Sequence, residues 1–238
     1  ITVVATQLNH ESDSIGPDYD KFADYPEVQP VSTLAGLTAA LKDSDINGKT
    51  LKLYGNIDTS AVLTISNKDI AIDLNGYTLN GTAKNTIKLA AGTKLTVKNG
   101  TITNAYNGKE DAMTVDLVGA GAEFTLLSGT VESNSKDNLY SVAIGNSKKK
   151  ACTVNIAGGT VKNLDGHAKS RAISASNGMT LNVSGGVING GLYGIDAYAG
   201  SVINITGGSV YANGKDGRTD EYGTTYAVHA KGEATITI

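Results

Sequence analysis

The amino-acid sequence predicts an all-β solenoid, a parallel β-helix with three short strands in each turn. The first observation is a phrase of the form apolar, Asn, apolar, small, Gly, Gly, small, apolar, which occurs at 154–161, 181–188 and 203–210. Its copies begin 27 and 22 residues apart, a spacing typical of solenoids, whose turns bury their apolar faces only against one another. The second observation is an apolar-x-apolar segment before each copy. Third, the chain has 29 Gly, two Phe and no Trp, which suits thin aliphatic layers.

The repeat extends toward the N-terminus. Further copies of the phrase occur at 95–102 and 124–131, and a degenerate copy at 72–76. The second glycine of each phrase serves as a marker, and successive markers are separated by 29, 30, 27 and 22 residues. Because the lengths vary while the phrase does not, we expect the insertions to lie in loops. The paired glycines predict a tight corner with positive φ after the middle strand of each turn.

Strand alternation within the phrase sends its apolar residues inward and its asparagines to the other face. Asn155, Asn182 and Asn204 occupy the same place in three successive turns. We therefore expect an asparagine ladder in which the side chains hydrogen-bond along the solenoid axis, with a structural role.

The apolar-x-apolar segments that open each turn predict a second outward column. Five of them begin 10 or 11 residues before the second apolar position of the following phrase, and the segment at 142–144 begins 14 residues before it. The middle residues of these segments form the predicted column of Lys88, Asp116, Ala143, Ser174, Asp196 and His229. Beside it, Ala172, Gly194 and Ala227 are expected to face outward and give a shallow floor.

Three regions follow from these patterns. Residues 1–30 lack the repeat, carry six acidic residues between 11 and 27, and are interpreted as an extended acidic arm. Residues 31–48 are expected to cap the solenoid with a short helix over 33–42, for which Ser32 is the predicted N-cap, followed by a turn. The β-helix then occupies 49–238. Its last turn is incomplete, so we expect the chain to continue or a partner to cover this end.

Charge and composition argue against several classes of function. The formal net charge is -3, which gives no basic footprint for nucleic acid, and no apolar run is long enough to span a membrane. The single cysteine, Cys152, begins an apolar strand and is predicted to be a buried small hydrophobe. We expect no metal site and no cofactor.

The rung phrases at 95–102, 124–131, 154–161, 181–188 and 203–210 resemble the right-handed parallel β-helices of the pectate-lyase-like superfamily. The resemblance covers roughly residues 31–238 and implies a right-handed solenoid. That superfamily includes polysaccharide lyases and hydrolases, phage tailspikes and fibres, and bacterial surface and adhesin proteins. Its enzymes place acid and base residues on the outward positions of one sheet.

By that resemblance, a catalytic site would lie on the opener column, where Ser174, Asp196 and His229 are the candidates. Residues in one flat ladder point side by side instead of converging, so we expect a surface ladder and no catalytic site. The lyase branch also requires calcium held by several carboxylates and an arginine base. This chain has only two arginines, Arg171 and Arg218, and its acidic residues do not stack into a cage.

Two loops, 104–111 and 211–226, are the remaining candidates for binding. The long insertion between 211 and 226 combines aromatic and charged residues, as sugar-binding surfaces do, and its candidate ligand-binding residues are Tyr211, Arg218, Tyr222 and Tyr226. A solvated loop is the alternative interpretation. The run Lys148 to Lys150 is predicted to be an exposed hairpin tip.

The sequence thus favours a non-enzymatic structural or adhesive β-helix, displayed outside a cell or on a virion as a spacer, fibre or decoration. We expect its partners to be a surface glycan, a capsid or a cell wall, or further copies of the chain, a trimer if it is a fibre. The alternative is a polysaccharide lyase or glycoside hydrolase that acts on an acidic polysaccharide along the β-helix face.

Overall fold

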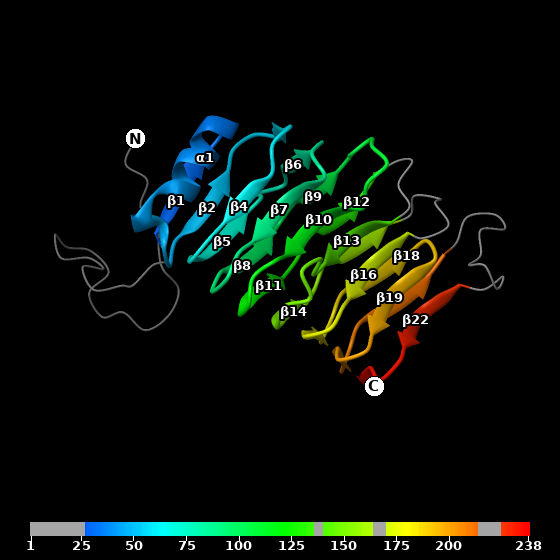
Figure 1. The fold of residues 1–238 in the computed structure, drawn as a ribbon. Coiled ribbons are helices and arrows are strands. Elements are labelled where there is room, and N and C mark those ends of the chain that lie inside the picture. Colours follow the sequence, from blue (N-terminus) through cyan, green and yellow to red (C-terminus); the bar gives the residue numbers. More distant parts are fainter. Residues whose placement is uncertain (1–26, 136–139, 164–169, 214–224) are drawn as a thin grey trace, which may run out of the picture.

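The computed structural model describes residues 27–135, 140–163, 170–213 and 225–238. Its strands form three parallel sheets of nine, seven and seven strands, and from β2 on successive strands along the chain pass from one sheet to the next. Each turn of the chain therefore adds one strand to every sheet, and the turns stack along one axis (Figure 1). The described part of the protein is a right-handed parallel β-helix, as the sequence predicts.

The nine-stranded sheet, sheet A, contains the middle strands of the repeat. In spatial order its strands are β1 (Val28–Val31), β2 (Thr50–Leu53), β5 (Asp69–Asp73), β8 (Lys94–Lys98), β11 (Ala122–Leu126), β14 (Cys152–Ile156), β17 (Met179–Val183), β20 (Val202–Ile205) and β23 (Thr235–Thr237).

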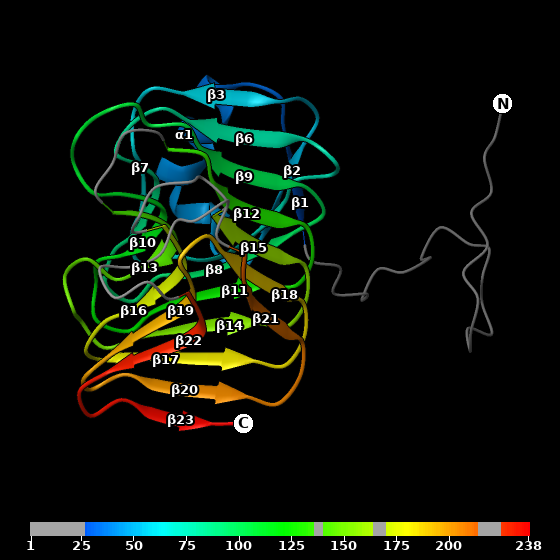
Figure 2. The same cartoon turned by 90° about the vertical axis from the view of Figure 1, so that its right-hand side faces the viewer.

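The two seven-stranded sheets contain the closing and opening strands. Sheet B consists of β3 (Ile57–Thr59), β6 (Thr78–Gly81), β9 (Thr101–Asn104), β12 (Thr130–Ser133), β15 (Thr160–Asn163), β18 (Val187–Gly190) and β21 (Ser209–Ala212). Sheet C consists of β4 (Leu63–Ile65), β7 (Asn85–Leu89), β10 (Ala112–Leu117), β13 (Ser141–Gly145), β16 (Arg171–Ala175), β19 (Tyr193–Tyr198) and β22 (Tyr226–Lys231). Figure 2 shows the three sheets around a common interior.

One aliphatic core runs through that interior. Alternate residues of the sheet A strands are buried, so that Val154, Ile156 and Leu181 are completely inaccessible to solvent. Cys152 is also buried in this core, as predicted. Toward the last turn the burial becomes incomplete, because Ile236 has no further turn beside it in the described structure.

The predicted asparagine ladder is present on the outer face of sheet A. Asn204 Nδ2 donates to Asn182 Oδ1, and Asn182 Nδ2 donates to Asn155 Oδ1, each at 2.9 Å. The ladder continues one turn further, where Asn155 Nδ2 donates to Thr125 Oγ1 at 3.2 Å. The amides of Asn155 and Asn182 both donate and accept, so neighbouring turns are joined by side chains as well as by backbone.

The corner glycines are required for two reasons. Gly159 has φ +73°, and a Cβ at that position would lie 2.5 Å from the carbonyl oxygen of Gly129 in the preceding turn. The turns approach one another too closely for any side chain here. The predicted positive-φ corner is therefore confirmed at Gly129, Gly159, Gly186 and Gly208, whereas at the 99–100 corner it is Asn99 that has positive φ.

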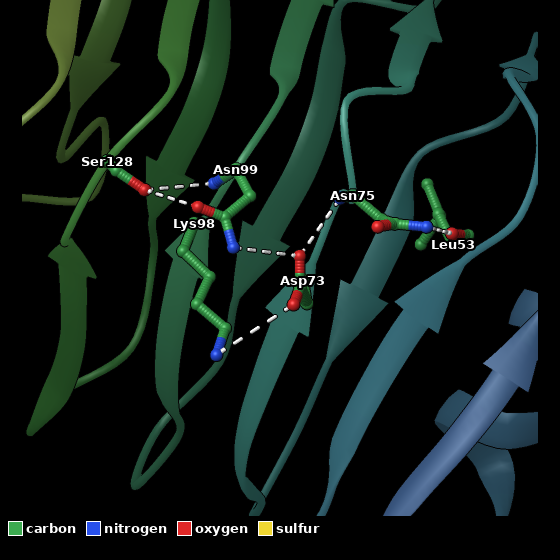
Figure 3. Close-up of polar contacts among 6 residues, drawn as sticks. All are labelled: Leu53, Asp73, Asn75, Lys98, Asn99 and Ser128. Atoms are coloured by element: carbon green, nitrogen blue, oxygen red, sulfur yellow. Dashed lines mark hydrogen bonds and ion pairs between the residues drawn. The ribbon is translucent and has the colours of Figure 1, made fainter. Parts of the chain in front are cut away.

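Polar side chains stabilise the earlier corners, where the phrase is degenerate (Figure 3). Asp73 Oδ1 accepts hydrogen bonds from Asn75 N at 2.9 Å and from Asn99 Nδ2 at 3.2 Å. Ser128 Oγ then contacts both the backbone N and the Oδ1 of Asn99 at 3.0 Å. These contacts join three successive turns, as the asparagine ladder does later in the chain.

The helix α1 (Leu34–Lys42) and a 3-10 turn, η1 (Ser44–Ile46), lie at the β2 end of the stack. Leu37 and Leu41 are buried in the core cluster, as their helical spacing predicts. The N-cap is Thr33, whose Oγ1 accepts from Gly36 N at 3.1 Å, so the prediction of Ser32 is wrong by one residue. Both residues are hydroxyl-bearing, and the sequence pattern does not separate them.

The boundary of the predicted arm also shifts. Residues 28–31 form β1, which pairs in parallel with β2, and Val31 is buried. The first strand of the solenoid thus overlaps the last three residues of the predicted arm, and residues 1–26 of that arm lie outside the described structure. Lys49 forms an ion pair with Glu27 at 2.8 Å beside this strand.

The opener column differs from prediction at one position. Asp116 pairs with Gly145, and Gly145 pairs with Ser174, so the column contains Gly145 in place of Ala143. A register shift of two residues leaves the same face of the strand pointing outward, so the apolar pattern of the sequence does not distinguish Ala143 from Gly145. A Cβ at position 145 would lie 2.8 Å from Met113 Sδ, so this glycine leaves space for the methionine.

Candidate functional site

A groove with a volume of about 900 Å³ runs across the outer face of sheet C. It crosses the strands from β7 to β22, and part of its wall comes from the connection between β13 and β14. The residues that line it are Lys84, Asn85, Lys88, Asp111, Met113, Asp116, Tyr140, Val142, Ser147, Lys148, Lys149, Arg171, Ser174, Ser176, Asn177, Tyr198, Ala199, Lys231 and Gly232.

The groove is basic although the whole chain is acidic. Five lysines and Arg171 line it, against Asp111 and Asp116, whereas the formal net charge of the chain is -3. Lys84 forms an exposed ion pair with Glu110 at 3.6 Å. The other four lysines, Lys88, Lys148, Lys149 and Lys231, make no ion pair with any residue in the described ranges. Their charges are therefore available to a ligand.

The lysine turn after β13 is fixed by buried polar groups. Asp116, which is 2% exposed, accepts from Ser147 N at 2.9 Å and from Ser147 Oγ at 2.8 Å. Asn146 Oδ1 accepts from Ser176 N at 2.9 Å in the next turn. Lys149 has φ +52°, which closes the turn. The predicted exposure of Lys148 to Lys150 is confirmed, and the turn also borders the groove.

Burial sets the ionisation of Asp116. Removal from water raises the pKa of this carboxyl above its usual value of 3.8, and the hydrogen bonds from Ser147 and the charges of Lys88 and Lys148 only partly offset that effect. Lys88 occupies the neighbouring turn in register with Asp116. The groove floor thus holds a carboxyl group that takes up a proton more readily than an exposed aspartate does.

A second buried carboxylate lies beyond Ser174. Asp196 is completely buried, and its Oδ2 accepts from Arg171 Nε while its Oδ1 contacts His229 Nδ1 at 2.8 Å. Burial alone would raise the pKa of Asp196, but the Arg171 guanidinium and the hydrogen bonds from His229, Arg171 and Tyr198 hold it below its usual value. Burial raises the pKa of Tyr198 to about 12, so this hydroxyl stays protonated and donates to Asp196.

Aromatic rings enclose this ion pair. The rings of Tyr193 and His229 stack with centroids 4.4 Å apart and an angle of 7°, and Tyr226 lies 5.1 Å from His229. The guanidinium of Arg171 lies 4.8 Å from the centroid of the Tyr140 ring and 5.4 Å from that of Tyr193. The cluster is rigid, with an apolar surface formed by ring faces.

The order of residues in the ladder differs from that of a nucleophilic triad. Asp196 pairs with Ser174 on one side and with His229 on the other, so the carboxylate lies between the serine and the histidine. A triad needs the histidine in the middle, where it can take the proton from the serine. Ser174 and His229 are two turns apart, roughly 9.6 Å at one inter-strand spacing of ~4.8 Å per turn.

A bend in the strands of sheet C changes which residues face the groove. Arg171 pairs with Tyr193, but the pairing skips the next position. There Ala172 and Gly194 are buried, and Ala172 belongs to the core cluster, so the prediction that they form an outward floor is wrong. Ala227 holds the same place in the last turn and is exposed. The true outward neighbours of the column are the larger Arg171 and Tyr193.

The four candidate residues of the long insertion do not all lie together. Tyr226, at the start of β22, joins the aromatic cluster, whereas Tyr211 lies on sheet B and is 48% exposed. Arg218 and Tyr222 lie outside the described residues. Of the two candidates that the structure describes, Tyr226 belongs to the aromatic cluster beside the groove and Tyr211 lies on another sheet.

Sequence reasoning did not assign Lys84, Tyr140, Tyr198 or Lys231 to a site. For Tyr198 and Lys231 the sequence spacing does indicate an outward position. Tyr198 follows Asp196 by two residues and pairs with Lys231, which follows His229 by two, so both continue the outward face of their strands.

Comparison with known proteins found no matching family model, no matching curated protein and no matching solved structure. The described structure is a parallel β-helix, and none of these comparisons assigns it to the pectate-lyase-like superfamily. Within the described ranges, no group of three or more His, Cys, Asp or Glu residues could hold a metal ion. The same residues include no helix with the length and hydropathy needed to cross a bilayer.

Proposed function

We propose that this chain is a non-enzymatic, adhesive β-helix displayed on a cell surface or virion, and that it binds an acidic glycan in the groove on sheet C. The observation that carries the glycan part is the basic groove itself, with four lysines that form no ion pair in the described structure. Lysine ammonium groups are mobile point charges that suit carboxylates or sulfates carried on a flexible polymer.

Two further features support a sugar ligand. Tyr140 and Tyr198 line the groove, and aromatic faces can stack on the apolar faces of pyranose rings. Ser174, Ser176 and Asn177 add neutral hydrogen-bonding groups to the same wall. The groove thus combines charge with the side chains that recognise hydroxyl-rich ligands.

The second candidate is a polysaccharide lyase or glycoside hydrolase. Asp116 favours it, because a carboxyl of raised pKa inside a groove is a candidate general acid. However, both oxygens of Asp116 are engaged by Ser147 and the group is 2% exposed, so its proton cannot reach a glycosidic oxygen without movement of the turn. Binding without cleavage is therefore the better supported function.

A glycan binding and cleavage assay separates the two candidates. We would titrate the protein with fluorescent oligomers of polygalacturonate, dextran sulfate and neutral dextran, and follow reducing ends and unsaturated products in the same samples. The proposal expects binding of the acidic oligomers only, with no products. If the protein cleaves an oligomer and Asp116→Asn abolishes the cleavage, the adhesive proposal is wrong and the protein is an enzyme. Equal binding of single-stranded DNA of the same charge would mean that the groove recognises charge alone.

Display on a surface is supported by the outer faces of the solenoid, which carry Asn, Thr and Ser ladders such as the one through Asn182. Antibody labelling of intact cells or particles that produce the protein tests it. Light scattering tests the assembly: a trimer or a larger particle is expected for a fibre, and a monodisperse monomer would restrict the protein to a decoration or spacer.

A further inference from the structure

Asp116 is a negative charge buried directly beneath the most basic part of the groove. Its carboxylate lies one turn from Lys88 and accepts two hydrogen bonds from Ser147, the residue before Lys148. An anion bound between these lysines must approach that carboxylate through a poorly solvated region. Repulsion in such a region is stronger than in water, because the effective dielectric constant is lower.

We propose that Asp116 links anion binding in this groove to proton uptake, so that a bound anion favours the protonated carboxyl and a protonated carboxyl favours the bound anion. The proposal rests on the proposed function, since it assigns a regulator to the same groove. The two effects are reciprocal by thermodynamic linkage. Protonation of Asp116 removes its negative charge from the groove floor and leaves Asp111 as the other acidic lining residue, while Ser147 N can still donate to the neutral group.

The groups around Asp116 allow this behaviour. The positive charges of Lys88 on β7 and Lys148 after β13 act on its carboxyl, and Asn85 Nδ2 lies 3.4 Å from its Oδ2. On β14, the thiol of Cys152 interacts with Asp116, but burial raises the pKa of that thiol to about 11, so it stays neutral. Burial already raises the pKa of Asp116, so its carboxyl takes up a proton at a higher pH than an exposed aspartate does.

The sign of the effect separates it from a merely structural role. If Asp116 only held the lysine turn, Asp116→Asn would loosen the turn and weaken anion binding. If its charge opposes the ligand, the same variant binds more tightly at neutral pH, by about threefold to tenfold for one charge at close range. Asp73→Asn is the matched control, because Asp73 also accepts from a backbone N–H at a turn but lies on sheet A.

Dextran sulfate is the probe, since its sulfates stay ionised throughout the range from pH 4 to pH 8. Calorimetric titration in two buffers of different ionisation enthalpy would measure the protons taken up on binding. We expect wild type and Asp73→Asn to bind more tightly as the pH falls and to take up protons. Asp116→Asn should bind tightly at all these pH values and take up fewer.

The outcomes distinguish this inference from the function on which it rests. If wild type does not bind dextran sulfate at any pH, both fail. Binding that is independent of pH, or proton uptake that is equal in wild type and Asp116→Asn, overturns the linkage alone and leaves the groove as the binding site. Weaker binding by Asp116→Asn at neutral pH would also overturn the linkage and assign Asp116 a structural role. The wild-type titrations decide the matter even if the variant does not fold.

Discussion

Arg171 donates a hydrogen bond to Asp196 across two neighbouring turns of the solenoid, and both side chains are almost fully excluded from solvent. The pair lies diagonally, since Arg171 is in register with Tyr193 and reaches three residues along the next strand. Asp196 also contacts His229 in the following turn, so one carboxylate connects three turns. We interpret this cluster as the polar anchor of the sheet that carries the groove.

Removal of one partner of the Arg171–Asp196 pair should lower the stability of the fold. Asp196→Ala leaves a buried guanidinium without its counter-charge, for which we expect a loss of about 3–5 kcal/mol in the free energy of unfolding. Urea denaturation measures it, with Asp58→Ala, an exposed aspartate on β3, as the control expected within about 0.5 kcal/mol of wild type. A loss below 1 kcal/mol would show that the pair is not formed. Asp196→Ala is accordingly a poor test of catalysis, because lost activity could reflect unfolding.

The two buried carboxyls should give opposite dependences of stability on pH. The pKa of Asp196 is lowered on folding, so its contribution is complete above its usual value of 3.8 and is lost as the pH falls through the lower folded value. The pKa of Asp116 is raised, so its contribution is complete at low pH and is lost as the pH rises through the folded value. Denaturation of Asp116→Asn from pH 4 to pH 8 should therefore show its advantage over wild type growing with pH. A constant difference would contradict this assignment.

The asparagine ladder should contribute measurably through its middle member. Asn182→Ala removes one hydrogen bond to Asn155 and one from Asn204, for which we expect a loss of about 1–2 kcal/mol, since the half-buried amides that remain are only partly rehydrated. Thr180→Ala, on the same face of β17, is the control for loss of a β-branched side chain. Chemical denaturation of both variants decides the question: equal losses would mean that the ladder adds nothing beyond strand propensity.

Two glycine variants separate conformational strain from close approach of the turns. Gly48 and Gly159 have φ +78° and φ +73°, but a Cβ on Gly48 meets nothing within 4 Å, whereas one on Gly159 would lie 2.5 Å from a backbone oxygen. Gly48→Ala should cost about 1–2 kcal/mol from the left-handed conformation alone. Gly159→Ala should cost clearly more, because two turns must separate. Thermal unfolding that ranks the two variants equally would contradict the close packing of the corners.

The sequence predicts the solenoid well because every turn has the same physical requirements and therefore repeats the same residue pattern. Val154 and Leu181 must point inward, Asn155 and Asn182 can pair only in one register, and Gly159 is required by the approach of the next turn. Each of these requirements is local or involves the adjacent turn. The fold class, the asparagine ladder and the corners are therefore predictable from spacing alone.

The groove is harder to predict, because it depends on local irregularities of sheet C that the repeat spacing of the sequence does not show. The bend in sheet C sends Ala172 inward and Arg171 outward, which a strict alternation of two does not anticipate. The shift from Ala143 to Gly145 keeps the alternation and is likewise invisible. Lys148 reaches the groove because the carboxylate of Asp116, a full turn away, holds Ser147.

The most direct test of the account is whether the position of the lysines matters, and not their number. We would replace Lys88, Lys148 and Lys231 by serine in one variant, and Lys52, Lys94 and Lys98 on sheet A in another, so that both have the same net charge. Binding of a fluorescent polygalacturonate oligomer is then measured by anisotropy. We expect the groove variant to lose at least tenfold in affinity and the sheet A variant to bind within about twofold of wild type. Equal losses in the two variants, or no loss in the groove variant, would contradict a binding site on sheet C.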